Sequence, residues 1–371
     1  MKYRSRTFLG VTLRILFGIA FSIASFSRTT RTPPMEPLSV LIVRFDLMGD
    51  IVNALSATAA ARERWPKAHI VFMAPPRWKA IVDRCETVDE ILPFDAGELT
   101  HWPTVLNVRA WFSALRMLRN VRARRFDVAC SVYGPVAGVV VALSGAAWRV
   151  GYQNEAPARS FDEPIAGHRQ NGGPHEATMA TRVVANTHPQ WKVLSRRSRA
   201  TDVVTEKRPH VVIHPGSSHG EAKRWPVQNW VKLGHLIQGR VGQLTIIGLS
   251  DASTVSHALS NSGTTTSNRC GRTSLEELMD VLQDADVVIS TDSGPGHLAR
   301  ALGTPVVMLH GPTDISIHGP GAPNCRALRV QLPCGPCYDF KRPAECQYSD
   351  TLCMHWLKAT SVREAMDELL E

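Results

Sequence analysis

Short apolar runs alternate with amphipathic stretches along the first half of the chain. Residues 39–44 are β-branched and aliphatic and lie between turn residues, a pattern typical of a buried parallel strand. After a loop ending in Gly49 and Asp50, alanine and leucine recur at helical spacing over 51–64, and 69–73 predicts a second strand. A strand, a helix and a strand within about 35 residues form a βαβ unit, so a parallel sheet is expected.

The same alternation continues along the chain and divides it into two units. Further strands are predicted at 90–94 and 127–132, with a basic amphipathic helix at 111–125. Residues 157–209 are polar and irregular, with helical character only at 176–185, so we place the domain connection late in that stretch. The second half predicts strands at 211–214, 243–248, 286–290 and 305–309, and helices at 227–239, 252–260, 274–283 and 296–303. We expect an α/β protein with two facing Rossmann-like domains, residues 35–200 and 201–371, and a ligand in the cleft between them.

Residues 1–34 form a basic and apolar leader. They hold six basic residues and no acid, and so account for six of the nine net positive charges of the chain. The uninterrupted apolar run from Ile15 is about 12 residues, which is short of the roughly 20 that a spanning helix needs. Two interpretations stay open: an anchor at an anionic membrane surface, or a start codon assigned too far upstream, with Met35 as the true beginning.

Composition excludes several classes of protein. With 371 residues, 44% hydrophobic and 20% charged, the chain is neither largely disordered nor a multi-span membrane protein. Eight cysteines are too few for a disulfide scaffold of this size, which favours a reducing compartment. Four of them have the spacing C-x2-C-x8-C-x6-C, which suits either reduced structural thiols, the interpretation we favour, or a metal centre: Cys334, Cys337, Cys346 and Cys353.

Phosphate-binding chemistry is the clearest functional signal. The chain has neither G-x-G-x-x-G after a strand nor G-x-x-x-x-G-K-[ST], but residues 291–297, Thr-Asp-Ser-Gly-Pro-Gly-His, end a strand and open a helix. Glycine lets backbone amides approach a ligand, and the helix N-terminus attracts anions, so a diphosphate would fit there. An ordinary capped helix start is the alternative.

Two further loops follow predicted strands. Residues 214–218 form a small hydroxylated turn, and Lys223 and Arg224 come shortly after it, where a cation could stabilise a departing diphosphate. Residues 311–314 form another turn. The arginines at 116–125 and 196–199 are interpreted as solvated faces, and the alternative is contact with a phosphorylated acceptor or the membrane surface. A nucleic-acid surface is not expected, because no aromatic interleaving accompanies them.

The ordered set of motifs resembles glycosyltransferase family 9, the bacterial heptosyltransferases of lipopolysaccharide core synthesis. The segments that carry the resemblance are 41–50 (LIVRFDLMGD), 149–152 (RVGY), 175–176 (HE), 223–226 (KRWP), 271–276 (GRTSLE), 291–299 (TDSGPGHLA) and 311–314 (GPTD). The resemblance runs from about residue 37 to the C-terminus. It implies a GT-B fold, inversion at the anomeric carbon without a required metal or other cofactor, and usually a C-terminal helix that packs back onto the first domain.

The resemblance also implies roles for individual residues. Asp50 matches the catalytic base, although a carboxylate there is also a good helix N-cap. Lys223 matches a phosphate-contacting lysine, and the other matched donor-binding residues are Ser217, Ser218, Thr273, Asp292, Ser293, Gly294 and His297. Asp251 is a further donor-binding candidate, since it stands near where family members often hold a ribose-binding glutamate. ADP-heptose is the implied donor, and the acceptor is lipopolysaccharide core or another lipid-linked saccharide. Segment 130–134 (CSVYG) departs from the family's acidic pattern and leaves the choice of acceptor open.

Two other functions compete with transfer. A nucleotide-sugar epimerase also uses two facing Rossmann-like domains, and a non-catalytic sugar-nucleotide-binding protein would keep the fold without the chemistry. The joint presence of Asp50, Lys223 and Asp292 argues against the non-catalytic protein, and product analysis without acceptor separates the transferase from the epimerase. Such an enzyme is expected in the cytoplasm, peripheral at the inner membrane.

Overall fold

A computed structural model describes most of the chain. The described residues are 32–97, 108–156, 160–167, 172–185, 187–197, 208–217, 220–338, 344–348 and 350–371. The predicted leader, residues 1–34, therefore lies almost entirely outside them. Among the helices within the described ranges, none combines the length and apolar character that crossing a membrane requires.

The first domain is built on a six-stranded parallel sheet with the order β3-β2-β1-β4-β5-β6. Its strands are β1 (Ser39–Val43), β2 (His69–Ala74), β3 (Glu90–Pro93), β4 (Val128–Ser131), β5 (Trp148–Tyr152) and β6 (Glu163–Ile165). The four predicted strands are confirmed. The last two were not predicted, and β6 falls within the stretch interpreted as irregular, because an exposed three-residue edge strand carries no apolar pattern.

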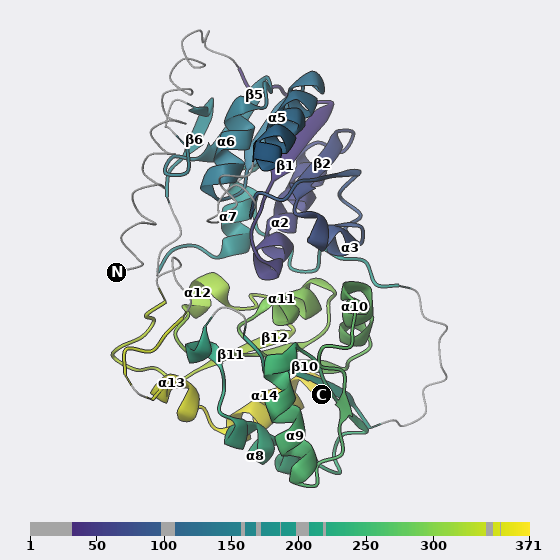
Figure 1. Ribbon diagram of the computed structural model, residues 1–371, viewed down its shortest axis with the longest axis vertical. Helices are drawn as coiled ribbons and strands as arrows, with labels where there is room; N and C mark the ends of the chain where they lie inside the picture. The colour runs from purple at the N-terminus through teal and green to yellow at the C-terminus, as the bar shows by residue number, and fades with distance from the viewer. Residues whose placement is uncertain are drawn as a thin grey trace.

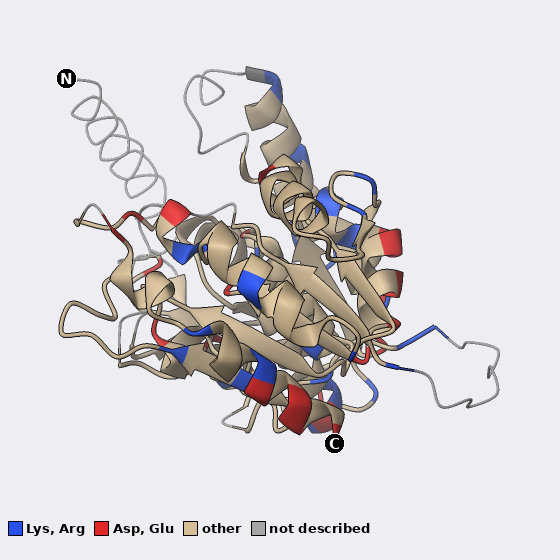
Figure 2. Cartoon of the chain, turned by 90° about the horizontal axis from the view of Figure 1, so that it is seen from below, with Lys and Arg blue, Asp and Glu red and all other residues tan. Residues whose placement is uncertain are grey.

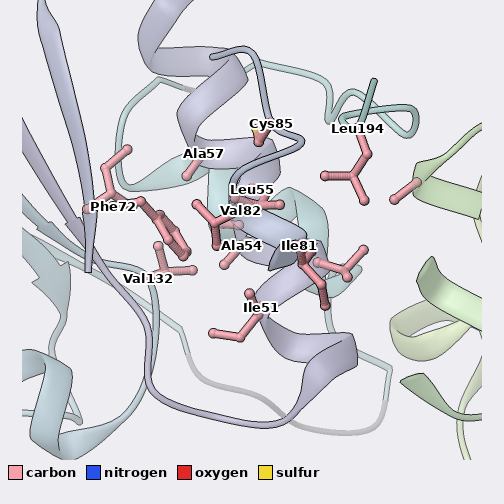
Figure 3. Packing of buried hydrophobic residues seen from close by; sticks show 14 of the residues in the cluster. Ile51, Ala54, Leu55, Ala57, Phe72, Ile81, Val82, Cys85, Val132 and Leu194 are labelled. Carbon is pink, nitrogen blue, oxygen red and sulfur yellow. The ribbon is translucent and has the colours of Figure 1, made fainter. Parts of the chain in front are cut away.

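Helices cover both faces of this sheet (Figure 1). Alternate residues of β1 point to opposite sides: Val40 and Ile42 pack with α2 (Met48–Arg64) and α7 (Glu176–Arg182), while Leu41 and Val43 pack with α5 (Val108–Ala123) and α6 (Pro135–Leu143). Small alanines let α2 lie close to the sheet, with Phe72 and Val132 on one side and the short α3 (Lys79–Val82) on the other (Figure 3).

Helix α5 is the basic helix that the sequence predicted at 111–125. It stands out from the body of the molecule (Figure 2), and its arginines at 109, 116, 119 and 122 are exposed. Just beyond it, Arg124 pairs with Glu90 at 2.7 Å. The exposed side chains agree with a solvated face.

The second domain repeats the plan with the strand order β12-β11-β10-β7-β8-β9, again all parallel. Its strands are β7 (His210–His214), β8 (Gln243–Ile246), β9 (Ser267–Asn268), β10 (Val287–Thr291), β11 (Val306–His310) and β12 (Cys325–Arg329). Its helices are α8 (Val227–Ile237), α9 (Ser253–Asn261), α10 (Leu275–Gln283), α11 (Gly294–Ala301), α12 (Ile315–His318), α13 (Leu352–His355) and α14 (Ala359–Leu370). The strands and helices predicted for this half are confirmed within a few residues at their ends.

The C-terminal helix departs from the expectation that the family resemblance gave. Helix α14 packs on its own domain, where Val362, Ala365 and Met366 share a buried cluster with Trp225, Trp230 and strands β7, β10 and β11 (Figure 1). The prediction that it packs back onto the first domain is wrong for this chain. Its apolar stripe is already buried against α8, so none of that surface is left to cover another domain.

The two domains are packed tightly together. One hydrophobic cluster runs from β1 and α2 of the first domain into α10 and α11 of the second. Polar bonds cross the same boundary: the buried guanidinium of Arg300 donates to Asn53 Oδ1 at 2.9 Å, and Arg84 pairs with Asp280. This packing brings the strand ends of the two sheets toward one another.

Candidate active site

Asp50 lies in the first turn of α2 and not before it. The helix begins at Met48, three residues earlier than the pattern predicted, and the Oδ2 of Asp50 accepts the backbone N–H of Leu47 at 3.2 Å. The residue therefore does cap the helix, but it reaches back from the third helical position. Its Oδ1 accepts a hydrogen bond from Arg44 Nη2 at 3.0 Å, and the side chain is only 13% exposed.

Asp292 is the centre of the corresponding group in the second domain. It directly follows β10 and is 4% exposed, with Lys223 Nζ at 3.0 Å from Oδ2 and His297 Nε2 at 3.4 Å from Oδ1. Lys223 also lies over the ring of Tyr338, with Nζ at 4.8 Å from the centroid. Burial alone would raise the pKa of Asp292, but Lys223 and His297 outweigh it and hold that pKa well below its usual value.

The turn that opens α11 is held by its neighbours. Ser293 is the N-cap residue, and its hydroxyl lies 2.9 Å from His214 Nδ1 at the end of β7. Thr291 Oγ1 donates to the carbonyl of Gly216 at 2.6 Å, which ties the turn after β10 to the turn after β7. Burial lowers the pKa of His214 to about 4, so its imidazole is neutral at physiological pH. The backbone amides of the α11 start are thus held in place for an anion.

The other donor-binding candidates follow adjacent strands of the same sheet edge. Ser217, after β7, donates its backbone N–H to Asp251 Oδ2 at 3.1 Å, and Arg224 Nη2 lies 3.3 Å from the same oxygen. Thr273 precedes α10 beside the turn after β8, where the Gly271 N–H donates to the Gly248 carbonyl at 2.7 Å. The structure therefore brings together every described residue of the predicted donor group along four strand ends. Ser218 lies outside the described residues.

The first turns of α2 and α11 lie side by side where α2 reaches the second domain (Figure 1). A β-carbon on residue 49 would lie 3.0 Å from His297 Cδ2, and one on residue 294 would lie 2.9 Å from Met48 Cβ, so glycine at both positions permits this approach. Two positive helix ends meet here, with the Arg44–Asp50 pair beside Gly49 on one side and the Lys223–Asp292 pair beside His297 on the other. The arrangement can hold an anion next to a carboxylate.

Sequence reasoning left several residues of this region without a role. Arg44 lay within the first motif, and His175 and Glu176 were family landmarks only. His175 Nδ1 accepts the Ala177 N–H at 3.0 Å, so its Nε2–H donates to the Gly319 carbonyl across the domain boundary at 2.7 Å. Burial lowers the pKa of His175 to about 3 and keeps it neutral. In the sequence, the only signal for a role of His175 was its place in a two-residue motif after a polar loop.

The four-cysteine segment lies beside this region, since Cys337 donates its backbone N–H to the carbonyl of Pro312 at 2.9 Å. Cys334 and Cys337 are exposed, Cys346 and Cys353 half-buried, and all four are free thiols. Within the described ranges, no three or more His, Cys, Asp or Glu side chains are grouped to hold a metal ion.

Known proteins resemble this chain over most of its length. Lipopolysaccharide heptosyltransferase 2 of Salmonella typhimurium is 22% identical over 317 residues, covering 79% of this chain and 88% of that protein. A glycosyl transferase family 9 protein from Veillonella parvula superposes with a TM-score of 0.70 at 16% identity, covering 92% of this chain and 99% of that one. Heptosyltransferase WaaC of E. coli, solved with ADP, gives a TM-score of 0.68 at 18% identity, covering 89% and 99%.

Two facing α/β domains with parallel sheets, shared with these structures, define a GT-B glycosyltransferase. The predicted fold is therefore confirmed. The model of glycosyltransferase family 9 (heptosyltransferase) matches residues 114–347, which is more than half of the chain. The protein belongs to glycosyltransferase family 9.

Proposed function

We propose that this enzyme transfers a heptose from ADP-heptose to a lipopolysaccharide core or another lipid-linked saccharide. The observation that carries the proposal is the contact of Gly49, next to Asp50, with His297, which pairs with Asp292 beside Lys223. Relatives add support: they include lipopolysaccharide heptosyltransferases, and WaaC has been solved with ADP and with ADP-2-deoxy-2-fluoro heptose. The proposed reaction needs no cofactor.

In this proposal, the diphosphate of the donor lies at the start of α11. The backbone N–H groups of Ser293 and Gly294 and the ammonium of Lys223 bind it, while Asp251 and Thr273 are candidates for contact with the nucleoside. The acceptor hydroxyl oxygen attacks the anomeric carbon of the sugar, the bond from that carbon to the phosphate oxygen breaks, and the nucleoside diphosphate leaves with the electron pair. Asp50 takes the hydroxyl proton, and attack from the opposite face inverts the anomeric centre.

A ligand screen followed by product analysis tests the proposal. ADP and ADP-heptose should raise the melting temperature by several degrees at about 100 times Kd, because binding to the native state alone then adds about 2.7 kcal/mol. UDP and GDP at the same concentration serve as controls. With ADP-heptose alone the donor sugar should stay unchanged, and transfer should begin only when a heptose-deficient lipopolysaccharide core is added. Conversion of the donor sugar without acceptor would instead identify an epimerase, and binding without any turnover a non-catalytic protein.

We further propose that residues 1–34 hold the enzyme at the cytoplasmic face of the inner membrane, close to a lipid-borne acceptor. Their six basic residues suit an anionic leaflet. Deleting residues 1–34 should move the protein from the membrane fraction to the soluble fraction while leaving kcat on a detergent-free core saccharide within about twofold. An unchanged distribution, or a native N-terminal peptide that begins at Met35, would contradict the anchor.

A further inference from the structure

Arg44 is a buried cation beside the proposed base. It directly follows β1, its backbone N–H donates to the Met73 carbonyl at 3.0 Å, and its side chain is 3% exposed. Its guanidinium lies 2.8 Å from Asp46, 3.0 Å from Asp50 and 3.9 Å from Glu176. A buried guanidinium stays charged, so it has to be compensated by nearby acids.

The guanidinium is fixed from several directions. Its Cζ lies 5.1 Å from the ring centroid of Tyr133, just after β4, while Glu176 comes from the start of α7 and Asp50 from α2. A planar fork of donors held by carboxylates of two helices and by an aromatic ring has little freedom to rotate. The oxygen of Asp50 that it contacts is therefore held in one orientation relative to the sheet.

We propose that Arg44 is the positioning residue for Asp50, the base that deprotonates the acceptor; this inference rests on the proposed function. Arg44 orients Asp50 and keeps its carboxylate ionised. The cation lies within hydrogen-bond distance, and an opposite charge so close favours the charged form of the acid. Asp46 and Glu176 contact the same guanidinium, so three carboxylates share this one cation.

The surroundings of the pair include groups from both domains. His318 of α12 lies 3.8 Å from the other oxygen of Glu176, and His297 of α11 packs on Gly49, next to Asp50. In the proposal, Arg44 contacts the carboxylate of Asp50 and no reacting atom of the substrates, so its role is to position Asp50.

The test compares Arg44→Gln and Arg44→Lys with a matched control. We expect Arg44→Gln to lower kcat by about 10²-fold, which is the usual loss when a catalytic group is misplaced. The Kd for ADP should change by less than about twofold. The acid limb of its pH–rate profile should move to higher pH, because a carboxylate without the adjacent cation protonates more readily. Lysine should recover only part of kcat, since it supplies a point charge without the fork.

The control is Arg149→Lys, which breaks a second buried pair of the same domain, the one with Asp162 at 2.9 Å. It should lower the melting temperature about as much as Arg44→Lys, yet leave kcat per folded molecule and the pH profile unchanged. A kcat loss in Arg149→Lys equal to that of Arg44→Lys would reduce Arg44 to a structural residue and overturn the proposal.

A measurement without turnover separates this proposal from the proposed function. The side-chain carboxyl carbon of Asp50, assigned with Asp50→Asn, can be followed by 13C NMR during a pH titration of the substrate-free protein. In Arg44→Gln its titration should move to higher pH, and in Arg44→Lys by less, whether or not heptose transfer is ever detected. An unmoved titration in Arg44→Gln overturns the role of Arg44, while absent transfer in the wild type overturns the proposed function alone.

Discussion

Replacing Asp50 by Asn or Ala is expected to lower kcat by about 10²- to 10⁴-fold, the range of a lost general base. Asparagine keeps the shape of the side chain and can still accept the Leu47 N–H, but it cannot take a proton from the acceptor hydroxyl. In the proposed function the donor is bound by the other domain, so the Kd for ADP-heptose should change by less than about threefold. Initial rates of transfer at saturating donor, together with calorimetric titration of ADP, measure both quantities.

The control for this variant is Asp162→Asn, which removes another buried carboxylate of the first domain that is paired with an arginine. Both variants lose a charged hydrogen bond and should melt at lower temperature, but only Asp50→Asn should lose turnover. Retained turnover in a folded Asp50→Ala enzyme would refute the role of Asp50 as base. A large loss of ADP affinity in that variant would instead place Asp50 in donor binding.

Replacing Lys223 by Met is expected to reduce the free energy of unfolding by about 3–5 kcal/mol, because it leaves the buried carboxylate of Asp292 without its ammonium partner. The double variant Lys223→Met/Asp292→Asn should be less destabilised than the sum of the single variants, since the uncompensated charge is then gone. Urea unfolding of the ligand-free protein at pH 7 measures these differences. Donor affinity should fall as well, by about tenfold or more, if Lys223 binds the diphosphate.

The pH dependence of the same pair follows from the lowered pKa of Asp292. A carboxyl whose pKa is depressed in the folded state adds stability at any pH above its unfolded value near 3.8 and loses it as pH falls toward the folded value. The difference in free energy of unfolding between the wild type and the double variant should therefore be constant from pH 7 to about pH 5 and shrink below about pH 4. Lys79→Met, which breaks an exposed pair with Asp83, should change stability by less than about 0.5 kcal/mol at any of these pH values. A difference in unfolding free energy that grows as the pH is lowered would contradict the pairing of Asp292 with Lys223 as the cause of this pH dependence.

Much of the fold could be read from local patterns. The central strands β1, β7, β10 and β11 are buried on both faces, so their apolar runs were continuous and their positions were confirmed. Turn residues after these strands predicted where polar chemistry gathers, and the structure places Ser217, Asp251 and Asp292 along one sheet edge. The edge strand β6 and the short α12 and α13 were missed, because elements of three or four residues carry no measurable period.

The sequence by itself determined the strand-end turns, the ordered family motifs and the two α/β units, since each depends on residues close together in the chain. The tertiary structure decided what those residues face. Glu176 contacts Arg44 although 132 positions separate them in the sequence, and Asp292 pairs with Lys223 across a separation of 69 positions. Gly49 and Gly294 let two helix N-termini from different domains touch, and α14 stays on its own domain. Such contacts depend on strand order and on the packing of one domain against the other, which no local pattern encodes.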